Sequence, residues 1–147
     1  MIVGFNFKKI NVERKKKLIK GMKVVYNMDI SNVYNQDFLL NKSKSHKILG
    51  FDFSFTVRYE PEIADMTIGG TVNYMLPENE TKRILDLWKK SRKLPKEVSV
   101  PVINVILDRC NIKALELEQD LSLPTHLPMP SIGAGKVENK DAEKYIG

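Results

Sequence analysis

The sequence of 147 residues contains one cysteine and two histidines. A single cysteine cannot form an intrachain disulfide, and disulfide-free chains are typical of the cytosol, so we expect a cytoplasmic protein. Cys110 and the histidines, His46 and His126, lack the spacing of metal ligands, which argues against a zinc site. No apolar run approaches the ~20 residues of a transmembrane helix, and no signal peptide is recognisable, so we expect neither.

Catalytic motifs are also missing in complete form. Residues 133–136 (GAGK) resemble part of a phosphate-binding loop, but the hydroxyl residue that should follow the lysine is absent. Glu60, Glu62 and Asp65 cluster where a turn is expected, and solvated carboxylates are usual in turns. We therefore predict a protein without catalytic residues, bound metal or cofactor.

Basic residues are in excess and unevenly distributed. The formal net charge is +6, and residues 1–50 carry 11 Lys and Arg against 3 Asp and Glu. Such a segment can face an anionic partner such as RNA, lipid headgroups or an acidic protein, although a lysine-rich solubilising surface is the alternative. The candidate anionic-partner patch consists of Arg14, Lys15, Lys16, Lys17, Lys20 and Lys23.

Four segments alternate between apolar and polar residues, the pattern of half-buried strands. They are residues 3–12, 22–33, 48–59 and 66–74. The first changes phase after Phe7, which predicts a β-bulge. In the last, Gly69 and Gly70 predict another bulge or a close approach of backbones. The short connection around Pro61 predicts an antiparallel hairpin between the last two strands.

Two helices are expected after the strands. The first follows Pro77, with acidic residues at its start and basic residues at its end, as the helix dipole favours. The second extends from about Val98 to Leu121 with apolar residues at helical spacing. Proline is tolerated in a first helical turn, so this helix should begin near Pro101.

This order of elements predicts an α+β fold with a four-stranded, mainly antiparallel sheet followed by two helices. We expect one domain over residues 1–132 and a flexible tail over residues 133–147. Between helix and tail, the proline-rich segment Leu123–Ile132 should be extended and lie against the protein. It either closes the core as a strap or frames a groove.

The pattern of elements resembles the SecB family of protein-export chaperones over roughly residues 5–132. That family has a four-stranded antiparallel sheet, a long helix and a proline-containing extended segment. In this chain the opening strand FNFKKI and the glycine-containing strand TIGGTV are similar to strands of the family. The segments that carry the resemblance are residues 5–10, 22–30, 51–59, 67–72, 100–103, 108–110 and 121–130.

The resemblance implies an ATP-independent holdase that binds unfolded or precursor polypeptides in an apolar groove and forms a homotetramer as a dimer of dimers. Members that deliver clients to the export motor are typically acidic, whereas this chain is basic, so a general holdase and an antitoxin-linked role both stay open beside protein export. The candidate groove residues are Phe53, Phe55, Val57, Tyr74, Met75, Leu123, Leu127 and Met129.

Two other hypotheses remain. A basic α+β module could bind RNA or a ribonucleoprotein through its N-terminal third. Aromatic stacking on RNA would require aromatic and basic residues on one face of a strand, but Arg58 alternates with the phenylalanines and falls on the other face. A small enzyme would require titratable groups that converge in a pocket.

Overall fold

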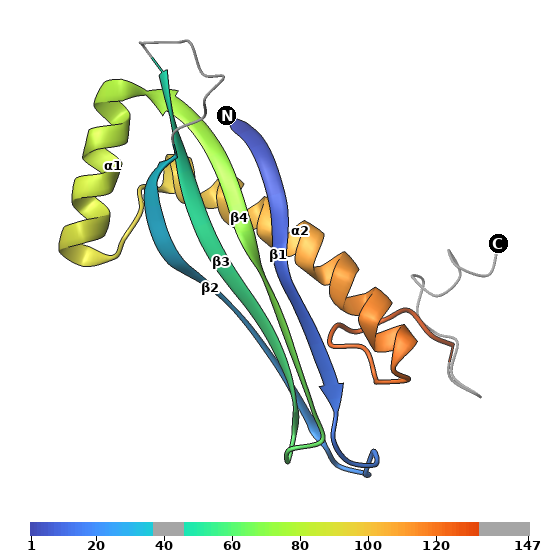
Figure 1. The fold of residues 1–147 in the computed structure, drawn as a ribbon. Helices are drawn as coiled ribbons and strands as arrows, with labels where there is room; N and C mark the ends of the chain where they lie inside the picture. Colours follow the sequence, from blue (N-terminus) through green and yellow to red (C-terminus); the bar gives the residue numbers. More distant parts are fainter. Residues whose placement is uncertain (37–45, 133–147) are drawn as a thin grey trace.

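The computed structural model describes residues 1–36 and 46–132. It confirms the α+β class and the predicted order of four strands and two helices (Figure 1). The predicted tail over residues 133–147 lies outside the described residues. The elements are β1 (Ile2–Arg14), β2 (Lys23–Gln36), β3 (His46–Glu60), β4 (Ala64–Pro77), α1 (Glu78–Ser91) and α2 (Lys96–Asp120).

The four strands form one antiparallel sheet in the order β1-β4-β3-β2. The first two strands of the chain therefore lie at opposite edges, and the hairpin of β3 and β4 forms the middle. The sheet is long and twisted, and α2 crosses it obliquely (Figure 1). Both helices contribute to one core with the same sheet face, so neither of the helices in residues 1–36 and 46–132 covers the other face.

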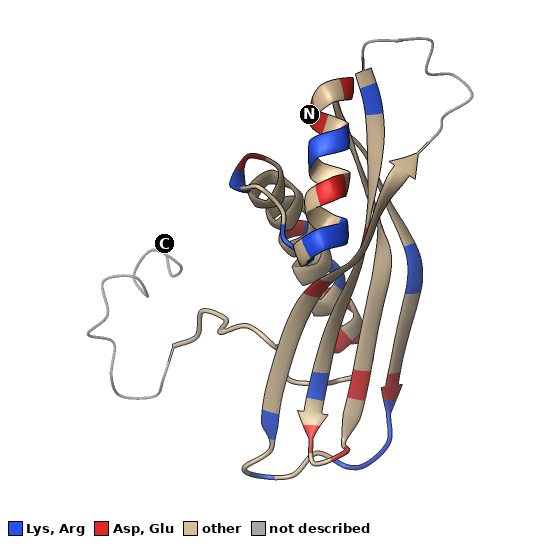
Figure 2. Ribbon diagram, turned by 90° about the vertical axis from the view of Figure 1, so that its left-hand side faces the viewer, with Lys and Arg blue, Asp and Glu red and all other residues tan. Residues whose placement is uncertain are grey.

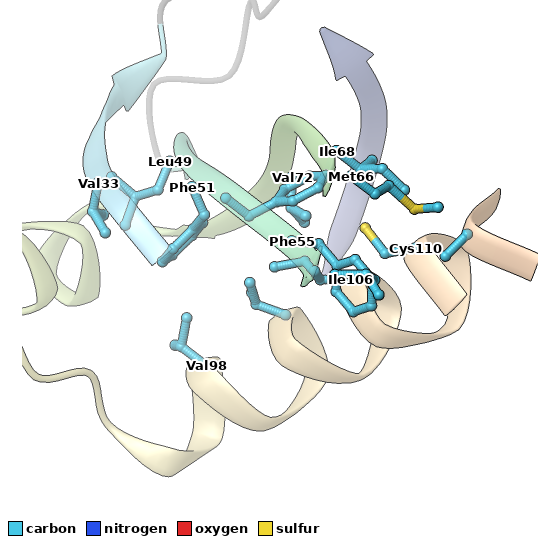
Figure 3. Packing of buried hydrophobic residues seen from close by; sticks show 14 of the residues in the cluster. Val33, Leu49, Phe51, Phe55, Met66, Ile68, Val72, Val98, Ile106 and Cys110 are labelled. Atoms are coloured by element: carbon cyan, nitrogen blue, oxygen red, sulfur yellow. The ribbon is translucent and has the colours of Figure 1, made fainter. Parts of the chain in front are cut away.

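The core begins with the alternation of β3. Phe51, Phe55 and Val57 are fully buried on the face that the helices cover, while Arg58 on the other face is exposed. Helix α2 closes this layer, and Figure 3 shows its side chains Ile106 and Cys110 pointing toward the sheet. Burial of these side chains is the main stabilising contribution to such a fold.

The expected irregularities of β1 and β4 occur opposite each other. The register between these strands shifts between Phe7 and Lys9, which pair with Gly70 and Gly69. A Cβ atom on Gly70 would lie 2.1 Å from the carbonyl oxygen of Asn6, so only glycine fits this close approach. The bulge in β1 thus lies directly opposite the glycine that allows the two backbones to approach. A further shift in β2, between Ile30 and Asn32, was not expected from the sequence.

Helix α1 agrees with the prediction, but the predicted start of α2 was wrong. The helix begins at Lys96, so Pro101 lies in its second turn. Proline has no N–H to donate to the carbonyl four residues earlier, and one hydrogen bond is lost. Val98 and Val102, on either side of this position, are buried against the sheet. Packing of these residues compensates for the missing bond.

Candidate functional site: a groove beside the edge strand

A groove of about 640 Å³ lies beside β2. Strand β2 forms one side, and the end of α1, the connection to α2 and the first turns of α2 form the other. The groove is lined by Met28, Asp29, Ile30, Ser31, Trp88, Arg92, Leu94, Ser99 and Ile103. Its size is in the range of sites that hold small molecules or a few side chains of a peptide.

Five of the nine residues that line the groove are apolar. Met28 and Ile30 both point to the helix-covered face of β2, where they lie beside Phe55 and Phe53 of β3. Trp88 is buried in the last turns of α1 and presents the largest ring of the lining. A partner with apolar side chains could bury them here without losing hydrogen bonds to water.

The guanidinium group of Arg92 lies over the indole ring of Trp88. Arg92 adopts a left-handed conformation (φ 56°) that ends α1, and its backbone N–H donates to the Trp88 carbonyl oxygen at 3.0 Å. This turn places the guanidinium carbon 5.3 Å from the centre of the indole ring. The arrangement is a cation–π contact. Asp29 also borders the groove, but it lies between Met28 and Ile30 on β2, so its side chain points to the other face of the sheet.

The second property of the groove is its position at a sheet edge. Among the described residues β2 pairs with β3 and with no other strand. One row of its backbone N–H and C=O groups is therefore not used by the sheet. Such a row can pair with an added extended segment, whatever the side chains of that segment are.

The sequence-predicted groove residues do not form this groove. Phe53, Phe55 and Val57 are 3%, 0% and 0% exposed, because they lie under the helices in the middle of the sheet. They are core residues and cannot line an open surface as the chain is folded. Tyr74 and Met75 are both half-buried neighbours on β4, and their side chains point to opposite faces.

The remaining three predicted residues belong to the strap, the name used below for residues Leu123–Ile132. Leu123 is buried, Leu127 is half-buried, and Met129 is 53% exposed. The strap follows α2 and has no regular secondary structure. Its first part, from Leu123 to Leu127, lies against the protein as the sequence predicted, and Leu123 belongs to the core, whereas residues 128–132 are exposed.

The strap is attached through a buried carboxylate, that of Glu118 in the last turn of α2. Oε2 of this residue accepts hydrogen bonds from the Tyr59 hydroxyl at 2.9 Å and the His126 backbone N–H at 2.7 Å. Oε1 contacts Nδ1 of the His126 ring. The Tyr59 hydroxyl is also 2.6 Å from the carbonyl oxygen of Pro124. Burial and the neighbouring carboxylate raise the pKa of Tyr59. A buried acid is stable only with such partners.

Sequence reasoning missed both Trp88 with its groove and Glu118. The tryptophan was recognisable only as part of a helical apolar stripe, since its neighbours in the groove come from other elements. The signal for Glu118 was present, because it occupies the position four residues after the buried Ala114. A charged residue on the buried stripe of a helix indicates a buried partner.

The candidate anionic-partner patch lies on β1, on the first residue of β2 and in the loop between them, and all six residues are exposed. Several are engaged within the chain. Arg14 donates to the carbonyl oxygen of Leu121, and Lys15 forms an ion pair with Asp65 at 2.7 Å. The same carboxylate raises the pKa of Lys15. Basic and acidic residues alternate at this end of the sheet (Figure 2). The structure gives no support to an RNA-binding surface.

Other reactive groups are inert or absent from the described ranges. Burial raises the pKa of the Cys110 thiol to about 12, so the reactive thiolate is disfavoured. Residues 1–36 and 46–132 contain no cluster of His, Cys, Asp and Glu that could hold a metal ion. In the same ranges, no helix is both long and apolar enough to cross a membrane.

Comparison with known proteins yields a match of structure but not of sequence. No family model and no curated protein matches the chain. Among solved structures, the fold is similar to the SecB-like chaperone Rv1957 of Mycobacterium tuberculosis, solved in complex with a ChAD peptide from the Rv1956 HigA1 antitoxin. The TM-score is 0.52, the sequence identity 12%, and the match covers 89% of each chain. The chain thus has a SecB-like fold.

Proposed function

We propose that this protein is a non-enzymatic chaperone that holds extended, apolar stretches of unfolded polypeptide in the groove beside β2. One observation carries the proposal, namely the apolar groove lying directly alongside the unpaired edge of a strand. An unfolded chain offers the two groups that such a site can bind. Its backbone can pair with β2, and its apolar side chains can enter the groove.

The free energy of this binding comes from burial rather than from a nucleotide. Each Å² of apolar surface removed from water contributes ~25 cal/mol to the free energy of binding. Several apolar side chains buried in the groove together therefore supply the binding energy. Backbone pairing adds hydrogen bonds that do not depend on sequence. The site therefore favours many clients with alternating apolar residues over one client with a defined sequence.

The comparison supports a polypeptide as the ligand. The SecB-like protein of similar fold was solved with a bound peptide. The central side chains Phe53, Phe55 and Val57 then act as the buried floor that keeps the sheet rigid. Client contacts come from Met28, Ile30, Trp88, Leu94 and Ile103.

A pair of substitutions on α2 tests the proposal. Ile103→Glu places a charge in the groove, while Val100→Glu places the same charge on the same helix at a position that is 51% exposed and outside the groove. The assay is the light scattering of insulin B chain as it aggregates after reduction. Wild type and Val100→Glu should suppress scattering at similar concentrations, and Ile103→Glu should require at least tenfold more protein.

Circular dichroism must first show that both variants are folded. Equal suppression by the two variants would contradict the groove as the client site. Absence of suppression by wild-type protein, with reduced and carboxymethylated lactalbumin also failing to bind, would contradict the chaperone function itself.

Self-association belongs to the same proposal. Strand β1 lies at the other edge of the sheet and exposes Val3 and Ile10. Pairing of two β1 edges would cover them and remove an edge that invites aggregation. We therefore propose the homotetramer that the SecB resemblance implies. Light scattering should give about four times 16.9 kDa at both low and high salt, whereas a monomer would contradict the assembly.

A further inference from the structure

Beyond the residues that line the groove, the chain's own strap packs against β2. Tyr26 lies two residues from Met28 on the same face of β2. The ring of His126 meets Tyr26 edge-on at 5.4 Å between centroids, and it meets Phe55 of the floor in the same way at 5.8 Å. His126 therefore lies on the path that a client beside Met28 would follow toward Val24.

The opposite wall of the groove shows the same arrangement. Ile103 lines the open part from α2. Asn111 follows two helical turns later, on the same side of the helix. Its Oδ1 atom lies 2.8 Å from Nε2 of His126. His126 thus reaches from the β2 wall to the α2 wall and fills the space between them.

The strap is held at few points. The backbone N–H of Leu123 donates to the carbonyl oxygen of Glu118 at 2.8 Å and caps the helix. Beyond it, the carbonyl oxygen of Pro124 lies 2.6 Å from the Tyr59 hydroxyl, and His126 makes the contacts to Glu118 and Asn111.

After His126 the chain makes few attachments. Met129 and Ile132 are 53% and 54% exposed. No strand pairs with this segment among the described residues. If the strap leaves the sheet from Pro124 onward, the α2 cap at Leu123 is kept, and Glu118 loses its contacts with His126 but keeps the one with Tyr59.

We infer that the strap is a displaceable plug, and that a long client replaces His126 and extends the groove along β2. This inference rests on the proposed function of the groove. The open part borders Met28 to Ser31, four residues or ~13 Å of strand. With the plug removed, it borders Val24 to Ser31, eight residues or ~26 Å. The strap then weakens the binding of long segments only, because short ones bind without displacing it.

Two fluorescein-labelled peptides of alternating Phe and Ser, five and ten residues long, test the plug by fluorescence anisotropy. In His126→Ala the ten-residue peptide should bind at least tenfold more tightly than in wild type, and the affinity for the five-residue peptide should change less than twofold. His126→Gln keeps a side-chain donor for Glu118 and should resemble wild type.

Hydrogen exchange on the wild-type protein provides a measurement that does not depend on a variant. The ten-residue peptide should abolish protection of the His126 amide, which donates to Glu118. The Leu123 amide, in the helix cap, should keep its protection and serves as the internal control. The five-residue peptide should change neither.

The outcomes separate the two proposals. If both peptides bind wild type, yet His126→Ala shows no length dependence and the His126 amide stays protected, the plug is refuted and the groove stands. If His126→Ala is unfolded, the exchange experiment alone decides. If neither peptide binds any folded variant, the proposed function is refuted and the plug with it.

Discussion

Substitution of Gly70 by alanine should weaken the fold at the junction of β1 and β4. The added Cβ would lie 2.1 Å from the Asn6 carbonyl oxygen and 2.8 Å from the ring of Phe53. An ordinary contact is about 3.4 Å, so the oxygen would have to retreat by the difference, about 1.3 Å. Asn6 pairs with Thr71 in this ladder, and the retreat would pull the edge strand from its partner.

The expected cost follows from three contributions. Overpacking of a well-packed site costs about 1–3 kcal/mol. Distortion of a neighbouring backbone hydrogen bond adds about 1 kcal/mol. Against this, alanine restricts the unfolded chain and returns about 0.4–1 kcal/mol. We expect a net loss of about 2–3 kcal/mol in the free energy of unfolding.

Gly69 supplies the control one residue away. A Cβ there meets the Phe53 carbonyl oxygen at 3.5 Å and Lys9 Cβ at 3.7 Å, which are ordinary contacts. Gly69→Ala should therefore leave stability unchanged or raise it by about 0.5 kcal/mol. In urea unfolding, the midpoint of Gly70→Ala should fall by about 1–2 M at the usual slope for small proteins. Equal midpoints for the two variants would refute the close approach of β1.

The remaining predictions concern buried polar groups. The raised pKa of Tyr59 means that the folded state keeps a proton that the unfolded state loses above about pH 10, so stability should fall with rising pH from there. Absorbance at 295 nm should show one tyrosine that titrates only as the protein unfolds, and a titration of every tyrosine in folded protein would contradict this. Cys110, with its pKa raised to about 12, should not react with Ellman's reagent at pH 8 until denaturant is added. Glu118→Ala leaves the His126 amide without its acceptor, while the Tyr59 hydroxyl keeps the carbonyl oxygen of Pro124, and the substitution should cost about 1–3 kcal/mol in urea unfolding. A loss below about 0.5 kcal/mol would show that the carboxylate does not hold the strap.

Much of the fold could be predicted from local pattern. The alternation of β3 identified its buried face correctly, because side chains of a strand point to opposite faces in turn. The phase change after Phe7 and the glycine pair of β4 indicated a bulge, and the structure shows them as one feature. The start of α2 could not be predicted, because the sequence shows only the low helical propensity of Pro101. The packing of Val98 and Val102 against the sheet depends on residues far away in the chain.

The candidate site was less predictable. Phe53 and Phe55 are residue types that are common in binding surfaces. Only their place on a central strand under the helices shows that they are buried in the core and do not line the groove. The Pro-rich segment was expected either to close the core or to frame a groove. The structure shows that Leu123 closes the core, while the ring of His126 packs against Tyr26 of β2 and Phe55 of β3.

The sequence by itself determined the elements, the apolar face of each strand and the extended character of the strap, because these depend on periodicity and on residues close in the chain. The tertiary structure alone decided which strands are edges, which apolar residues stay accessible and which groups the buried acid meets. Those properties depend on pairing of distant segments. Strand β2 forms an edge because β1 pairs with β4 across the sheet, and Glu118 is stable because the strap returns to it.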